Sequence, residues 1–298
     1  MREEGGSDMI PGQFDYVRPE SLDETLQLLA DMEGDAKLLS GGYSLLPLLK
    51  LRLGSASHLV DIGRIPGLEN IQEEDGFLKI GGRVRESEIE HSDLIRRRYP
   101  ILADTAAVIA DPLVRNLATV GGNLAHGDPA NDHPATMLAL GATVVATGPK
   151  GDRTIPIEKF FTGLFETALE RDEILTEIRI PVPPPKSGGA YVKLERKVGD
   201  FATAGAAAQV TLGSAGEIVR AGIGLTNAGL TPVKAADAEK YLQGKKPDEA
   251  AIAEAAKRAA AATDPSPDRR GTVEYKTEMA RVLTARALKR AVRRAQGA

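Results

Sequence analysis

The chain has 298 residues, a length that suits about two domains. Its 38 basic and 42 acidic residues give a formal net charge of −4, which argues against a general nucleic-acid binder, because such proteins are basic. The sequence contains no cysteine. It therefore cannot form disulfides, use a cysteine nucleophile, or hold zinc or an iron–sulfur cluster through thiolates.

The sequence carries no evident signal for membrane insertion or secretion. No run approaches the roughly 20 apolar residues of a membrane-spanning helix. The polar start, Met1–Asp8, lacks the apolar core of a signal peptide. We therefore expect an intracellular protein, and Met9 is an alternative start because ordered-looking sequence begins just after it.

Hydrophobic spacing and turn residues predict the elements of the first part of the chain. Ser21 and Glu24 fit a capping box that begins a helix over 21–31. A short apolar run, Lys37–Leu39, leads into Ser40 and a glycine pair. The other predictions, in chain order, are a helix over 44–51, strands over 58–62 and 77–80, helices over 86–98 and 101–110, a glycine-rich segment over 119–131, a helix over 134–140, and strands over 142–147 and 173–180.

The clearest domain boundary in the sequence is Pro181–Lys186. Its consecutive prolines cannot continue a helix or a central strand. Beyond it the pattern predicts a sheet covered by helices, with strands over 190–196, 204–212 and 218–226 and helices over 248–263 and 276–294.

Two segments join a pair of adjacent glycines to an apolar lead, and they span residues 39–47 and 118–124. Glycine lets backbone N–H groups approach an anion, and successive N–H groups can form an anion-binding nest. The hydroxyls of Ser40, Ser44 and Thr119 add further donors. Two such loops can hold the two phosphates of a dinucleotide from both sides, and a pair of ordinary tight turns is the alternative.

The common nucleotide-binding fingerprints are missing from the sequence. No G-x-x-x-x-G-K-[ST] segment is present. Gly222–Asn227 begins like G-x-G-x-x-G, but asparagine replaces the last glycine and the segment lies within a predicted strand. These observations argue against a Rossmann fold.

The segment His126–His133 contains two histidines and two aspartates, which are metal-ligand types. A metal site is therefore one interpretation, but the spacing matches no metal signature. An acceptor for ribose hydroxyls, with Asp132 at the start of the next helix, is the interpretation we favour. A plain helix N-cap at Asp132 is the alternative.

The segment Lys193–Ala204 mixes charged residues with one aromatic residue, Phe201. The alternating charge is typical of a strand edge, and Phe201 packs either in the core or beside a planar cofactor. No Ser-His-Asp order and no paired carboxylates stand out in the chain. The residues alone therefore indicate a dinucleotide-binding α/β protein and no general acid or base.

At these segments the chain resembles the flavin-binding (medium) subunits of molybdenum hydroxylases, in the xanthine dehydrogenase family, and among them those of aerobic carbon monoxide dehydrogenases. The likeness covers almost the whole chain after residue 8. The two glycine loops and Gly199–Ala202 are specific together, although none of them is specific alone. The matching segments are 9–12, 14–16, 41–47, 109–115, 119–132, 193–204, 223–227 and 271–279.

The resemblance implies an α+β fold. A PCMH-type FAD-binding domain of two α/β subdomains would be followed by a C-terminal domain with an antiparallel sheet and helices. The FAD-binding domain would span residues 9–180, with subdomains at 9–63 and 64–180, and the C-terminal domain would span residues 187–298.

The resemblance also implies which residues bind the cofactor. Both glycine loops would bind the FAD pyrophosphate, Asn123 and Asp132 would contact the adenosine half, and Leu175 would pack on the adenine or flavin side. Lys193 and the pair Asp200–Phe201 match a segment near the isoalloxazine ring. The expected set is Leu39, Ser40, Gly41, Gly42, Tyr43, Ser44, Leu45, Ala110, Ala118, Thr119, Gly121, Gly122, Asn123, Asp132, Leu175, Lys193, Asp200 and Phe201.

The implied reaction is electron transfer through a complex. A large partner subunit would hold the molybdenum cofactor, and a small partner subunit would hold two [2Fe–2S] clusters. Electrons would reach FAD on this chain and leave to an external acceptor such as a quinone. The resemblance implies a dimer of heterotrimers in the cytoplasm, with association at the inner face of the membrane as an alternative, and no catalytic residue or metal ligand on this chain.

Three alternatives to a carbon monoxide dehydrogenase subunit remain open at this point. The same subunit could serve a complex that oxidises an N-heterocycle, an aldehyde or a purine. The chain could be a stand-alone flavoprotein oxidase, against which the absence of an evident acid–base pair argues. It could also be a non-catalytic module that binds a nucleotide.

Overall fold

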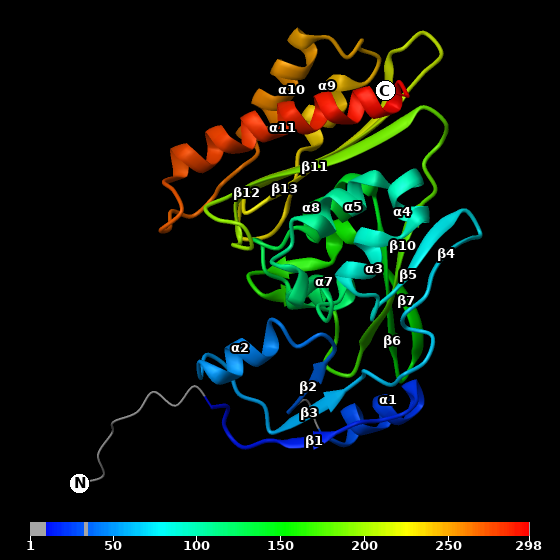
Figure 1. The fold of residues 1–298 in the computed structure, drawn as a ribbon, viewed down its shortest axis with the longest axis vertical. Coiled ribbons are helices and arrows are strands. Elements are labelled where there is room, and N and C mark those ends of the chain that lie inside the picture. Colours follow the sequence, from blue (N-terminus) through cyan, green and yellow to red (C-terminus); the bar gives the residue numbers. More distant parts are fainter. Residues whose placement is uncertain (1–9, 33–34, 298) are drawn as a thin grey trace.

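The computed structural model describes residues 10–32 and 35–297, in which three larger sheets follow one another along the long axis of the molecule (Figure 1). The alternative start at Met9, and the first residue of the predicted domain 9–180, lie outside the described residues. The division of the chain into segments 9–180 and 187–298 stays a prediction. No helix in the described ranges combines the length and the apolar character that crossing a membrane requires.

The first sheet has three strands, all parallel, in the order β1-β3-β2. Because parallel strands end at one edge of a sheet, the residues that follow them lie near one another. Ser21 begins the first helix by accepting a hydrogen bond from the Glu24 N–H, as predicted. The elements are β1 (Asp15–Val17), α1 (Leu22–Asp31), β2 (Ala36–Leu39), α2 (Leu45–Lys50) and β3 (His58–Asp61).

The second sheet has five antiparallel strands in the order β4-β5-β10-β6-β7, and helices pack against it around buried Tyr99 and Phe160. Its strands are β4 (Ile71–Glu74), β5 (Phe77–Gly81), β6 (Thr143–Gly148), β7 (Gly151–Pro156) and β10 (Ile174–Pro181). The remaining elements of this region are α3 (Glu86–His91), α4 (Asp93–Arg98), α5 (Pro100–Ala107), α6 (Pro112–Arg115), α7 (Val120–His126), α8 (His133–Leu140), the 3₁₀ turn η1 (Ile157–Lys159), and the small pair β8 (Phe161–Gly163) and β9 (Glu166–Thr167).

The third sheet is antiparallel in the order β11-β12-β13-β14. Helices α9, α10 and α11 lie on its outer side, and α5 and α8 lie between it and the rest of the molecule (Figure 1). The fold class is therefore confirmed. The elements are β11 (Ser187–Glu195), β12 (Ala202–Leu212), β13 (Ile218–Thr226), β14 (Val233–Lys234), α9 (Ala236–Leu242), α10 (Glu249–Ala261) and α11 (Val273–Ala295).

The two glycines of the near-fingerprint Gly222–Asn227 have a packing role inside β13, where the sequence predicted a strand. A Cβ on Gly222 would lie 2.0 Å from the Ala139 carbonyl oxygen, and one on Gly224 would lie 2.0 Å from the Ala135 carbonyl oxygen. Helix α8 therefore contacts the third sheet backbone to backbone, which only glycine permits.

The structure differs from the sequence predictions at two helices. The helix predicted over 86–98 breaks at Ser92, whose hydroxyl accepts a hydrogen bond from the Ile95 N–H and begins α4. The glycine-rich segment predicted over 119–131 begins with a helix, α7. Helices α6 and α9 and the short strands β1, β4, β7, β8, β9 and β14 had no clear hydrophobic period and were not predicted.

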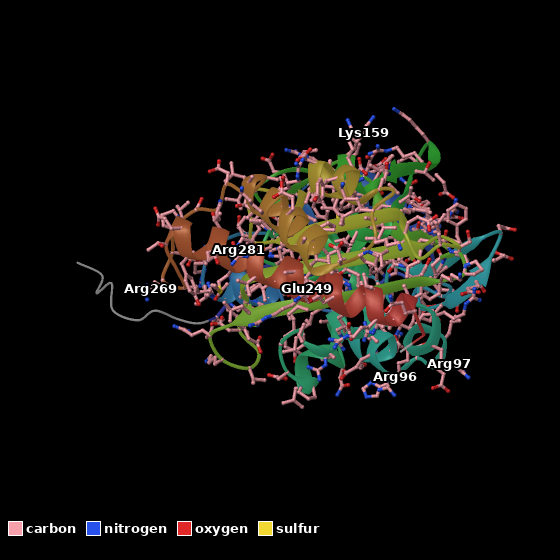
Figure 2. The ribbon with its side chains drawn as sticks, turned by 90° about the horizontal axis from the view of Figure 1, so that it is seen from above. Arg96, Arg97, Lys159, Glu249, Arg269 and Arg281 are labelled. Carbon is pink, nitrogen blue, oxygen red and sulfur yellow. The ribbon has the colours of Figure 1, made fainter. Side chains whose placement is uncertain are left out.

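A salt-bridge cluster joins α5 to the long helix α11, which crosses the middle of the view in Figure 2. The Asp104 carboxylate accepts hydrogen bonds from Arg294 at 2.6 and 3.0 Å and from Arg290 at 2.9 Å. It also accepts one from the Tyr191 N–H of β11 at 3.3 Å. Asp104 thus ties elements that are far apart in the chain.

We predict that Asp104→Asn lowers the free energy of unfolding by about 1–2 kcal/mol, because two arginines lose a charged partner that is mostly buried. Chemical denaturation of the full-length chain measures the change. The control is Asp93→Asn, since Asp93 is 85% exposed and 4.0 Å from Arg97, and should change stability by less than about 0.5 kcal/mol. Equal losses in both variants would contradict the prediction.

Candidate functional site

The two predicted glycine loops touch each other in the structure. A Cβ on Gly41 would lie 2.4 Å from the Leu117 carbonyl oxygen and 2.7 Å from the Cα of Ala118. Beside this contact the Ser40 and Thr119 hydroxyls are hydrogen-bonded at 2.9 Å, although 79 residues separate them in the chain. The structure therefore brings together the two segments that the sequence singled out.

The first loop follows strand β2 and turns sharply at Gly42, whose φ of +80° lies in the left-handed region. Its carbonyl accepts a hydrogen bond from the Leu46 N–H at 2.9 Å. Ser44 stands at the start of α2 but makes no side-chain capping hydrogen bond, and Tyr43 is 42% exposed. The hydroxyl of Ser44 and the ring of Tyr43 are thus not used to begin the helix or to fill the core.

The second glycine pair lies in the first turn of α7. Thr119 begins this helix by accepting a hydrogen bond from the Gly122 N–H at 3.2 Å. A Cβ on Gly121 would lie 2.4 Å from the Gly82 carbonyl oxygen, and a Cβ on Gly82 would lie 2.1 Å from that of Leu175. The backbone of Gly82 therefore lies directly between α7 and the backbone of Leu175, with no side chain between them. Leu175 itself is buried.

Asn123 carries a polar atom that the fold does not satisfy. Its side-chain oxygen is buried and, within the described residues, has no hydrogen-bond partner. Its main-chain oxygen accepts a hydrogen bond from the Asn131 side chain at 2.9 Å. Because buried acceptors are normally paired, an unpaired one beside the glycine loops indicates a place for a ligand donor.

Asp132 and Lys193 form a buried ion pair between α8 and β11, with 2.9 Å between Lys193 Nζ and Asp132 Oδ2. The Tyr191 hydroxyl donates to the other Asp132 oxygen at 2.6 Å, and Lys193 Nζ also donates to the Val108 carbonyl at 2.9 Å. Burial raises the pKa of Asp132, while Lys193 and Tyr191 act to lower it. Asp132 occupies the N-cap position of α8, but its side chain makes no capping hydrogen bond there.

Ala110 and the turn between β11 and β12 pack against each other. Ala110 has a φ of +45°, and a Cβ on Gly199 would lie 3.4 Å from its carbonyl carbon. Asp200 accepts hydrogen bonds from Arg270 at 2.7 Å and from the Phe201 N–H at 2.9 Å, and the Arg270 hydrogen bond holds the pKa of Asp200 below its usual value. Phe201 is 49% exposed and is therefore not a core residue.

The four possible metal ligands of His126–His133 point to different partners. The ring of His126 lies 5.2 Å from the Phe165 ring, and His133 Nε2 lies 2.6 Å from buried Glu86 Oε2. Asp128 accepts a hydrogen bond from the Ala130 N–H. In the described ranges, no three His, Cys, Asp or Glu side chains are grouped to hold a metal ion.

Four residues beside the glycine loops were missed by the sequence analysis. Arg18, Asp61, Arg83 and Arg85 line a cavity of about 200 Å³, together with Ser40, Gly41, Gly63, Leu117 and Thr119. Arg270, which lies 5.8 Å from the Phe201 ring, was also missed. Isolated charged residues in polar stretches form no sequence motif. Only the order of the strands in the sheet could have indicated that the four residues of the cavity lie together.

We predict that Lys193→Met destabilises the chain more at about pH 8 than at about pH 5, with a loss near 3 kcal/mol at the higher pH, because the Asp132 carboxylate stays buried without its cation. A carboxyl whose pKa is raised in the folded state contributes stability at low pH, which is lost as the pH rises through that pKa. Removing Lys193 raises the pKa of Asp132 further.

Chemical denaturation at the two pH values measures this difference. In the control variant Lys193→Met/Asp132→Asn the charge is absent, so the extra loss at high pH should disappear. A loss from Lys193→Met that is the same at both pH values would show that burial of the charge is not its cause.

Two family models match the chain, one for each of its two parts. Residues 12–183 match the family model described as the FAD binding domain in molybdopterin dehydrogenase, and residues 189–291 match the CO dehydrogenase flavoprotein C-terminal domain. The chain is 46% identical to the carbon monoxide dehydrogenase medium chain of Afipia carboxidovorans, over 97% of this chain and 100% of that protein. It is 39% identical to the 6-hydroxypseudooxynicotine dehydrogenase complex subunit alpha of Paenarthrobacter nicotinovorans, over 97% of each.

A solved structure of the Hydrogenophaga pseudoflava carbon monoxide dehydrogenase, in a form that lacks the Mo-pyranopterin moiety of the molybdenum cofactor, contains a similar chain. The TM-score is 0.93 at 45% sequence identity, with 96% of this chain and 99% of that chain covered. Family models cover both the flavin-binding part and the C-terminal part. The chain therefore belongs to the FAD-binding medium subunits of the molybdenum hydroxylases and is an oxidoreductase subunit of the carbon monoxide dehydrogenase-like kind.

Proposed function

We propose that the chain binds FAD where its two glycine loops meet and relays electrons within a carbon monoxide dehydrogenase complex. The observation that carries the cofactor site is the contact of Gly41 with the backbone of Leu117 and Ala118. It joins two glycine-rich loops at a point where hydroxyls and an unpaired Asn123 oxygen are also available. Such a set of donors and bare backbone suits phosphate and ribose groups.

The proposed cofactor residues fall into three groups. The phosphates would be held by the first loop and by the start of α7, from Leu39, Ser40, Gly41, Gly42, Tyr43, Ser44, Leu45, Ala118, Thr119, Gly121 and Gly122. The adenosine half would meet Asn123, Asp132 and Leu175. The isoalloxazine would lie toward Ala110, Lys193, Asp200 and Phe201, where a half-exposed aromatic ring offers a planar face.

When bound, FAD supplies the redox chemistry: it takes up electrons and passes them to an external acceptor such as a quinone. The chain itself positions the cofactor and sets the charge around it. The buried pair Asp132–Lys193 fixes two charges next to the site, and Arg270 holds Asp200 and the neighbouring Phe201. We assign no general acid or base to this chain.

The electrons must reach this chain from partners. The sequence contains no cysteine, so it cannot ligate an iron–sulfur cluster through thiolates. We propose a small subunit with two [2Fe–2S] clusters and a large subunit with the molybdenum cofactor, assembled as a dimer of heterotrimers in the cytoplasm. The names of the relatives support this. One is called a medium chain and another a complex subunit, and the description of the matched structure refers to the enzyme's molybdenum cofactor.

The substrate we propose is carbon monoxide, which with water gives carbon dioxide, two protons and two electrons. The support is the 46% identity to a carbon monoxide dehydrogenase medium chain, against 39% to a subunit that serves a different substrate. Because the substrate meets the molybdenum subunit, an N-heterocycle, an aldehyde or a purine is the second candidate class.

The complex purified through a tag on this chain tests the substrate. Reduction of an artificial acceptor should occur with carbon monoxide and not with xanthine, quinoline or an aldehyde. Turnover with one of the latter alone would overturn carbon monoxide and keep the subunit assignment. Turnover by this chain without partners would overturn the relay and favour a stand-alone oxidase.

We predict that Gly122→Val abolishes FAD binding, because the added side chain would start 2.8 Å from the Thr119 hydroxyl and 4.0 Å from Ser40, between the two loops. The measurement is the amount of FAD released by acid from the purified complex, counted per chain. The matched control is Ala125→Val, at an exposed position of the same helix, which should keep one FAD per chain. A full complement of FAD in Gly122→Val would contradict the proposed site.

A further inference from the structure

A small cavity opens at the carboxyl ends of the three parallel strands. Arg18 follows β1, Ser40 follows β2, and Asp61 is the last residue of β3. Arg83 and Arg85 line the facing wall, which belongs to the segment after β5. The cavity also shares Ser40, Gly41 and Thr119 with the two glycine loops, so it adjoins the proposed cofactor site.

We call this space, lined by Arg18, Arg83 and Arg85, the arginine cavity. The one carboxylate in its lining, that of Asp61, already accepts hydrogen bonds. Asp61 Oδ1 accepts a hydrogen bond from the Gly63 N–H at 2.7 Å. Its Oδ2 accepts one from the Tyr16 hydroxyl and lies 3.4 Å from Arg18 Nε. Asp61 therefore holds Arg18 in place, and both of its oxygens already accept a hydrogen bond.

Those two arginines keep unused hydrogen-bonding capacity. Arg83 is anchored through one nitrogen, which donates to the Ile65 carbonyl at 2.8 Å and lies 3.4 Å from Glu69. Within the described part of the chain, the guanidinium of Arg85 makes no ion pair and no hydrogen bond. Three guanidinium groups thus stand against two carboxylates, Asp61 in the lining and Glu69 beside Arg83, and the local charge is positive.

We propose that Arg18, Arg83 and Arg85 bind a phosphate group of the ADP half of the cofactor in this cavity. The inference rests on the proposed FAD function and adds three residues to it. Arginine binds phosphate oxygens through paired N–H donors, and the Ser40 and Thr119 hydroxyls add neutral donors on the same wall. The excess positive charge favours an anionic phosphate group and repels a metal cation.

The size of the cavity agrees with a phosphate group and not with a whole ligand. Its volume of about 200 Å³ is below the roughly 300–1,000 Å³ of pockets that enclose complete small molecules. A phosphate lodged there would be held between the first sheet, which supplies Arg18, and the second region, which supplies Arg83 and Arg85. Phosphate binding would therefore also hold these two parts of the chain together.

The test uses the full-length complex freed of bound flavin and titrated with FAD, ADP and riboflavin. Arg85→Gln should weaken FAD and ADP binding about tenfold or more and leave riboflavin binding unchanged, because riboflavin has no phosphate. Arg85→Lys should recover part of the affinity. Arg97→Gln is the control, since Arg97 lies at the periphery (Figure 2) with a 78% exposed side chain and should bind all three like the unmodified chain.

The outcomes distinguish a failure of the arginine cavity from a failure of the proposed FAD function. If Arg85→Gln and Arg83→Gln bind FAD and ADP normally while Gly122→Val binds none, the arginine cavity is not a phosphate site and the FAD function stands. If the unmodified complex binds neither FAD nor ADP, the proposed function itself fails. Pyrophosphate should compete with FAD in the flavin-free complex. Arginine-dependent binding of pyrophosphate to the FAD-loaded complex would instead overturn the assignment to the cofactor and indicate a free phosphate ligand.

Discussion

The candidate site depends on one steric constraint, the absence of a side chain at Gly41. With a Cβ, this residue would overlap the Leu117 carbonyl and the Ala118 backbone. Because it has none, the loop after β2 lies directly on the segment that leads into α7, and the Ser40 and Thr119 hydroxyls come within hydrogen-bonding distance. The first sheet, the arginine cavity and the start of α7 all take their relative positions from this contact.

A second constraint is electrostatic and holds the far side of the site. Asp132 of the flavin-binding part is neutralised by Lys193, which comes from the C-terminal sheet. The pair is buried, so each charge depends on the other to offset its lost hydration. The same sheet supplies the turn with Asp200 and Phe201, which packs on Ala110. The C-terminal part therefore contributes residues to the proposed cofactor site.

Much of this organisation could be predicted from the sequence, and the limits have physical causes. The hydrophobic periodicity predicted the long helices and the buried strands, and the glycine pairs predicted both loops. The helix at Gly121 and Gly122 was missed because glycine is a poor helix former, whereas the close contact of Gly121 with the Gly82 backbone has no room for a side chain. Arg18, Arg83 and Arg270 were missed because their roles arise from the order of strands and turns in space, which no local pattern records.

Helix α8 has a consequence for how the molecule unfolds. All eight of its residues are buried, and five of them, Ala135 and Met137 to Leu140, belong to the core around the second sheet, which also includes Tyr191 and Ala207 of the third. Through Gly222 and Gly224 the same helix rests on the backbone of β13. The helix thus belongs to the core around the second sheet and also covers the inner face of the third sheet, so separating the two sheets would expose its buried residues. We therefore expect the flavin-binding and C-terminal parts to unfold together, although the sequence divides them at a run of prolines.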